Sequence, residues 1–105
     1  MTLGEKQRLF TKLIAKLITY AYDNGYELTF GDAYRDHRVE YGHPNSLHRS
    51  RLAVDFNLFK NDEYLTKTSD HEPLGDYWES LDPLCSWGGR FDDGNHYSLK
   101  HNGMR

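Results

Sequence analysis

The sequence has one cysteine, no long hydrophobic run and no excess of basic residues, and each shortage excludes a class of protein. Because Cys85 is the only cysteine among 105 residues, neither an internal disulfide nor a multi-cysteine zinc site can form. The longest apolar segment, residues 13–22, is interrupted by Lys16 and is too short to cross a bilayer. The first twelve residues are polar and charged, unlike a signal peptide. We therefore expect synthesis in the cytoplasm and no membrane insertion.

The charge balance argues against a nucleic-acid-binding protein. Lys and Arg number 13 against 16 Asp and Glu, which gives a formal net charge of -3. Nucleic-acid binders usually carry a basic excess on one face. The length predicts one domain over residues 1–105 with a modest core, and no repeat or linker divides it. We expect this domain to be a monomer.

The first half of the chain predicts one helix and two strands. Apolar residues recur at helical spacing from about Gly4 to Asp23, where Asn24-Gly25 is a stop signal. Alternation over residues 26–30 predicts a half-buried strand that continues through residues 31–35, and residues 36–45 should form a loop. Residues 52–59 alternate again and predict a central strand, whose core face carries Leu52, Val54, Phe56 and Leu58.

The second half predicts a short return strand and a second helix. A turn over residues 60–63 leads to a possible strand at residues 64–66. Residues 68–70 offer helix caps, with His71-Glu72 as part of the cap, and apolar residues then follow helical spacing from Leu74 to Leu81, before Pro83. Residues from Lys100 onward are interpreted as a tail.

Candidate metal ligands centre on residues 46–55. Asp55 lies inside an apolar run, where a charge is costly unless it is paired, and a metal ion is one possible partner. His48 precedes it by seven residues, about 23 Å of fully extended chain, so the chain must fold back if both bind one ion. With His96, they would form a three-ligand oxygen and nitrogen set that suits Zn²⁺ and leaves a fourth position for water. From spacing alone this is a weak signal, because a chain with six histidines and many aspartates yields such triples by chance.

Three short motifs strengthen the metal interpretation. They are Ser46-x-His48-x-x-x-x-Ala53-x-Asp55, then Trp87-Gly88-Gly89, then Asp93-x-x-His96. In this order they resemble the zinc D-Ala-D-Ala carboxypeptidase and L-alanyl-D-glutamate endopeptidase family, which includes vancomycin-resistance carboxypeptidases and phage endolysins. The resemblance extends from about Tyr34 to Ser98. It implies an α+β fold of the Hedgehog/D-Ala-D-Ala-peptidase type, with an antiparallel sheet packed on an N-terminal helix and a second short helix.

The resemblance also implies a role for each site residue. His48, Asp55 and His96 would bind zinc, and Asp93 would be the catalytic base. Arg35 would stabilise the negative charge that develops on the scissile carbonyl, or hold a substrate carboxylate. Ser46 would contact the substrate or support one of the zinc ligands. The family's glycine in the first motif is replaced here by Arg51, which puts the turn between the ligands and the substrate preference in question.

The implied function is hydrolysis of the stem peptide of bacterial peptidoglycan. An endolysin-type L-alanyl-D-glutamate endopeptidase is favoured, acting on the cell wall after release during phage lysis of the host. A D-Ala-D-Ala carboxypeptidase is the close alternative. A zinc-containing cell-wall binding module without catalysis is a second alternative, against which the presence of Asp93 argues. A structural domain with accidental His and Asp spacing is a third.

Overall fold

The computed structural model describes residues 1–31 and 50–105. The predicted loop and three predicted site residues, Arg35, Ser46 and His48, lie outside these ranges. In chain order the described elements are α1 (Leu3–Asp23), β1 (Glu27–Phe30), β2 (Ala53–Lys60), β3 (Glu63–Leu65), the 3₁₀ helix η1 (Thr68–His71), α2 (Glu72–Leu81), β4 (Cys85–Trp87), the 3₁₀ helix η2 (Gly88–Phe91) and β5 (His96–Leu99).

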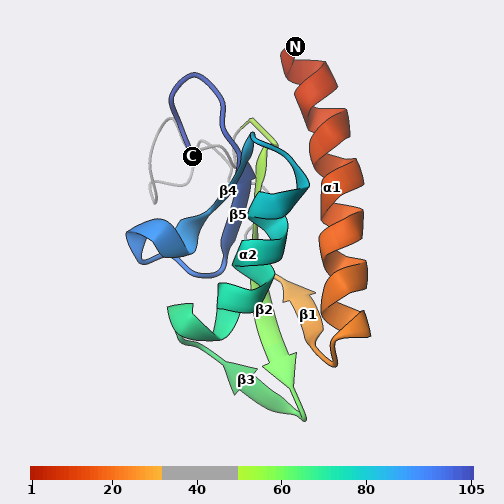
Figure 1. The fold of residues 1–105 in the computed structure, drawn as a ribbon, viewed down its shortest axis with the longest axis vertical. Coiled ribbons are helices and arrows are strands. Elements are labelled where there is room, and N and C mark those ends of the chain that lie inside the picture. Colours follow the sequence, from red (N-terminus) through yellow and green to blue (C-terminus); the bar gives the residue numbers. More distant parts are fainter. Residues whose placement is uncertain (32–49) are drawn as a thin grey trace.

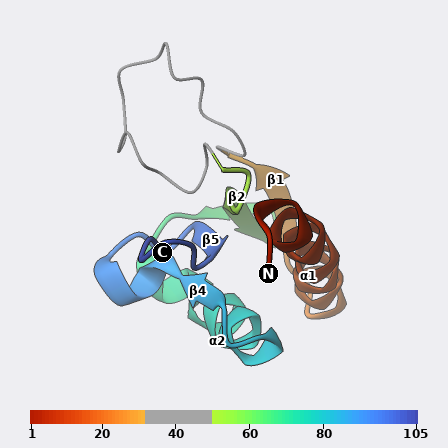
Figure 2. The ribbon, with the colours of Figure 1, turned by 90° about the horizontal axis from the view of Figure 1, so that it is seen from above.

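The strands form one antiparallel sheet in the order β1-β2-β5-β4, and β3 pairs with the far end of β2 (Figure 1). The strand that comes last in the chain, β5, therefore lies inside the sheet. Both helices cover the same face, with α2 over β4 and β5 and α1 beside it (Figure 2). The prediction of a small α+β domain with an antiparallel sheet and two helices is confirmed.

Helix α1 begins at a capping box and ends at the predicted Asn24-Gly25 stop signal. Thr2 and Glu5 form a capping box, in which Thr2 Oγ1 accepts from the Glu5 N–H at 3.1 Å and Glu5 Oε1 accepts from the Thr2 N–H at 2.8 Å. Gly25, with φ of 83°, turns the chain after the helix. The apolar stripe is buried as predicted, through Phe10, Leu13, Ile14, Leu17 and Ala21.

Strand β2 divides its side chains between two different environments. The four residues predicted for the core face are all at most 3% exposed. Asp55 and Asn57 point to the opposite face and are half-buried. The alternation predicted from the sequence is confirmed, and it places the Asp55 carboxylate on the face that the helices do not cover.

Trp78 of α2 ties the helix layer to the sheet. Its side chain is fully buried, and its indole Nε1 donates to the carbonyl oxygens of Ser86 at 3.2 Å and Ser98 at 3.1 Å. Phe10 of α1 packs edge-on against the same indole, with ring centroids 5.9 Å apart. Trp78 of α2 thus contacts α1 and the two strands β4 and β5, which lead to the predicted site.

Two expectations from the sequence are wrong in detail. In β1, Phe30 is 66% exposed although its alternation predicted a half-buried side chain. The segment after Lys100 is not a loose tail, because His101 and Met104 exchange backbone hydrogen bonds of 3.0 and 2.8 Å and Met104 packs against the core. Lys6 Nζ lies 3.0 Å from His101 Nδ1, which fixes this segment to α1. Among the described residues, no helix has the length and hydropathy needed to span a bilayer.

Cys85 of β4 should be chemically inert in the folded protein. The thiol is buried, and burial together with the charges of Asp82 and Glu79 raises the pKa of Cys85 to about 12. Because the thiolate is the nucleophile, we expect negligible alkylation by iodoacetamide at pH 8 and full reaction of one thiol per chain in denaturant. Mass spectrometry before and after unfolding measures this. Rapid alkylation of the native protein would contradict the buried position of β4.

Candidate metal and catalytic site

Two of the three predicted metal ligands face each other across neighbouring strands. Asp55 of β2 is the register partner of His96 of β5. The Phe56 N–H donates to the Asn95 carbonyl at 3.0 Å, one residue beyond this pair, so Asp55 and His96 form a non-hydrogen-bonded pair. In such pairs the side chains approach most closely. His96 Nδ1 lies 3.4 Å from Asp55 Oδ1, and their side chains are 8% and 15% exposed.

Asp93 reaches the same imidazole from the turn that precedes β5. Its carboxylate Oδ2 lies 4.0 Å from His96 Nδ1, and its side chain is 52% exposed. The His96 N–H donates to the Asp93 carbonyl at 3.1 Å, which closes the turn between them. The site therefore combines a shielded Asp–His pair with a carboxylate that is open to solvent.

Gly88 allows this turn to pack tightly. The Asp93 N–H donates to the Gly88 carbonyl at 2.9 Å. A Cβ built on Gly88 would overlap the Asp93 carbonyl oxygen and lie 2.7 Å from His96 Cβ. A side chain at this position would therefore push against both residues of the Asp93-x-x-His96 motif, which explains the glycine after Trp87.

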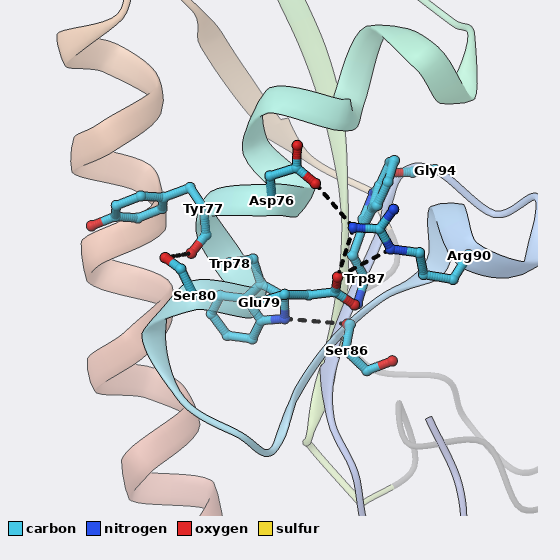
Figure 3. A network of polar contacts seen from close by, with 9 residues as sticks. All are labelled: Asp76, Tyr77, Trp78, Glu79, Ser80, Ser86, Trp87, Arg90 and Gly94. Carbon is cyan, nitrogen blue, oxygen red and sulfur yellow. Dashed lines mark hydrogen bonds and ion pairs between the residues drawn. The ribbon is translucent and has the colours of Figure 1, made fainter.

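The segment from β4 to η2 is held in place by α2 (Figure 3). Arg90 of η2 binds Glu79 Oε1 through Nε at 3.1 Å and through Nη2 at 2.9 Å, and the same Nη2 lies 2.9 Å from Asp76 Oδ1. The Trp87 backbone N–H donates to Glu79 Oε2 at 3.1 Å, and its indole N–H donates to the Gly94 carbonyl at 2.7 Å. These contacts anchor both ends of the segment that carries Asp93.

The donor atoms of Asp55 and His96 fit a tetrahedral zinc ion. Two ligand atoms that each lie about 2.1 Å from a tetrahedral ion are about 3.4 Å apart, and the Asp55 oxygen and His96 nitrogen are separated by 3.4 Å. A carboxylate oxygen and an imidazole nitrogen are also ligand types that zinc accepts. Within residues 1–31 and 50–105, no three or more His, Cys, Asp or Glu side chains are grouped so as to hold a metal. The described residues thus supply two of the predicted ligands, and the predicted third, His48, is outside them.

Arg51 adopts a backbone conformation that usually favours glycine. Arg51 has φ of 56°, in the left-handed region that glycine adopts without steric cost. Gln7 of α1 supports the same turn by donating from Nε2 to the Ser50 carbonyl at 2.9 Å. An arginine thus occupies a left-handed position at this turn, and its effect on substrate preference stays a prediction.

His71 is a polar residue of this region to which the sequence pattern gave no role beyond a helix cap. It does occupy the N-cap position of α2, but its side chain makes no capping hydrogen bond. The ring is instead buried, with Nδ1 2.8 Å from the Tyr97 hydroxyl. No local signal predicts this contact, because Tyr97 lies on a strand that joins the sheet far along the chain.

Comparisons with known proteins do not assign the chain to a family. No family model matches the sequence, and no curated protein matches it. The function therefore has to be argued from the site.

Replacing Asp55 with asparagine tests whether the pair binds metal. At a zinc concentration of 100 times the Kd, binding stabilises a folded protein by about 2.7 kcal/mol, and about 1 kcal/mol shifts Tm by roughly 4–8 °C in a domain of this size. We expect zinc to raise the Tm of the wild-type protein and to have little effect on Asp55→Asn. Asp62→Asn, which removes a carboxylate from the remote β2–β3 turn, is the matched control and should respond like wild type. If zinc leaves all three proteins unchanged and Asp55→Asn is simply more stable, the arrangement is accidental.

Proposed function

We propose that this chain is a zinc peptidase that hydrolyses the stem peptide of bacterial peptidoglycan, with a fold of the Hedgehog/D-Ala-D-Ala-peptidase type. The observation that carries the proposal is the convergence of Asp55, His96 and Asp93, which come from β2, β5 and the turn before β5. Asp55 and His96 are separated by the distance expected of two ligands on one ion. Asp93 is near enough to act beside that ion without being a ligand. The sequence resemblance supplies the substrate class.

Each residue has a distinct chemical task in this proposal. His48, Asp55 and His96 would hold the zinc, which when bound supplies a Lewis acid for the attacking water and the scissile carbonyl. Asp93 accepts a proton from the water and returns it to the leaving nitrogen. Its 52% exposed side chain is open to solvent and substrate, as this role requires. Arg35 would stabilise the oxyanion or bind a substrate carboxylate, and Ser46 would contact the substrate.

The favoured reaction is cleavage between L-alanine and D-glutamate by an endolysin. Such an enzyme is made in the cytoplasm of the infected host, acts as a monomer and meets its substrate after release to the cell wall. The net charge of -3 gives no general attraction to an anionic wall, so recognition would be local to the cleft.

Digestion of purified peptidoglycan tests the proposal. The zinc-loaded protein, the chelated protein and the chelated protein with zinc added back are compared by mass spectrometry of the released fragments. We expect new N-terminal D-glutamate ends in the first and third samples. Release of terminal D-alanine would instead assign a carboxypeptidase. Zinc binding without any released fragment would overturn the peptidase and favour a wall-binding module.

A further inference from the structure

A polar cavity of about 220 Å³ lies beside Asp93. It is lined by the β2–β3 hairpin, η1 and the turn of residues 92–95, and a water molecule occupies only about 30 Å³ of liquid volume. The cavity can therefore accept a group much larger than one water. The polar side chains of its wall that matter here are Asn57, Thr66, Thr68, His71, Asp92 and Asp93.

His71 is one of the residues that line this cavity. The residue is 3% exposed, and its Nδ1 is taken by the Tyr97 hydroxyl at 2.8 Å. Within the described part of the chain, no hydrogen bond reaches its other nitrogen, Nε2. Burial also lowers the pKa of His71, against the opposing charge of Asp70, so the ring is neutral near pH 7.

The contact with Tyr97 determines which nitrogen of His71 carries the proton. Tyr97 is fully buried, and its hydroxyl has His71 Nδ1 as its one hydrogen-bond partner among the described residues. A buried hydroxyl hydrogen needs an acceptor, so the Tyr97 O–H donates to Nδ1. In a neutral imidazole the proton then resides on Nε2, which becomes a donor.

We propose that this cavity is the peptide-binding subsite of the enzyme and that His71 donates from Nε2 to a carbonyl oxygen of the bound peptide. A donor selects an acceptor, and the carboxyl groups of Asp92 and Asp93 in the same wall disfavour an anionic one. A neutral amide carbonyl satisfies both conditions. Thr66 and Thr68 also line the cavity, and their hydroxyls can serve other polar atoms of the peptide. The inference rests on the proposed peptidase function, because it assigns a part of that substrate.

The test compares two amide substitutions that differ in where they place their polar group. His71→Asn puts its amide near the position of Nδ1 and can keep the contact with Tyr97, but it has nothing at Nε2. His71→Gln puts an N–H donor near the position of Nε2. The zinc-loaded proteins are assayed with a synthetic L-alanyl-D-glutamate peptide blocked at both ends, and thermal melting and zinc binding verify the fold of each variant.

If Nε2 binds the peptide, His71→Asn should raise KM about tenfold, the effect of losing roughly 1.4 kcal/mol, with kcat unchanged, and His71→Gln should restore KM. A structural role predicts the reverse, since asparagine preserves the Tyr97 contact and glutamine does not. An unchanged KM in a folded His71→Asn protein would overturn the subsite and leave the peptidase intact. If the wild-type protein does not cleave this peptide, the endopeptidase and the subsite both fail, whereas release of terminal D-alanine from peptidoglycan would still assign a carboxypeptidase.

The tautomer can be measured separately from activity. Long-range ¹H–¹⁵N correlation spectra of the wild-type protein should show the His71 proton on Nε2, and peptide added to a catalytically inactive variant should shift that signal. A proton on Nδ1 would overturn the inference even for an active enzyme.

Discussion

Replacement of Asp93 with asparagine is expected to slow hydrolysis strongly while zinc binding persists. General base catalysis contributes about 10²–10⁴-fold to rate, so the rate of fragment release from peptidoglycan should fall by about that factor. Asparagine keeps the size of the side chain and the backbone hydrogen bonds of Asp93 to Gly88 and His96, but it cannot accept the proton.

The control for this result is Asp62→Asn, which removes the same charge far from the site. Asp62 lies in the β2–β3 turn with φ of 62°, a conformation that asparagine also tolerates. This variant should cleave peptidoglycan at the wild-type rate. Wild-type activity in a folded, zinc-loaded Asp93→Asn protein would exclude Asp93 as the base.

Replacement of Gly88 with alanine should damage the site through the backbone. The added Cβ would overlap the Asp93 carbonyl and crowd His96, so the turn that holds both residues must move. Overpacking of this kind costs about 1–3 kcal/mol in stability, and a displacement of about 1 Å at a catalytic group can cost about 10²-fold in rate. We expect a lower Tm, weaker zinc binding and a large loss of hydrolysis together.

Gly4→Ala is the matched control for the glycine substitution. Gly4 lies in the first turn of α1, where a new Cβ would come no closer than 3.5 Å to Arg8 Nη1. Alanine favours the helix by about 0.5–1 kcal/mol over glycine, so this variant should be as stable as wild type or more stable, with full activity. If Gly88→Ala behaved in the same way, the turn would not require glycine.

The parts of the fold with strong periodicity could be predicted from the sequence. Helix α1 begins within one residue of its predicted start, because its apolar periodicity is a local signal that does not depend on the rest of the chain. The central strand β2 has the predicted core face because its alternation spans eight residues. β1 has only four residues, and alternation over so short a segment does not reveal that Phe30 stays exposed.

The geometry of the candidate site could not be predicted in the same way. The sequence motifs selected Asp55, Asp93 and His96, but their proximity depends on the register between β2 and β5, which connects distant parts of the chain. A shift of one residue in that register would turn one of the two side chains toward the face of the sheet that the helices cover. The environment of His71 depends on the same docking, since its partner Tyr97 is on β5. Local pattern therefore identifies the residues, and tertiary packing decides what they do.

The position of β5 has a consequence for the order of folding. Among the described strands it comes last in sequence order, yet it lies between β2 and β4 and carries His96. Contacts between segments so distant in sequence form slowly, because loop-closure entropy is lost before they stabilise the chain. A chain that ends before β5 lacks His96, and its Trp87 has no Tyr97 with which to pair. The Asp55–His96 pair should therefore form only after β5 has docked between β2 and β4.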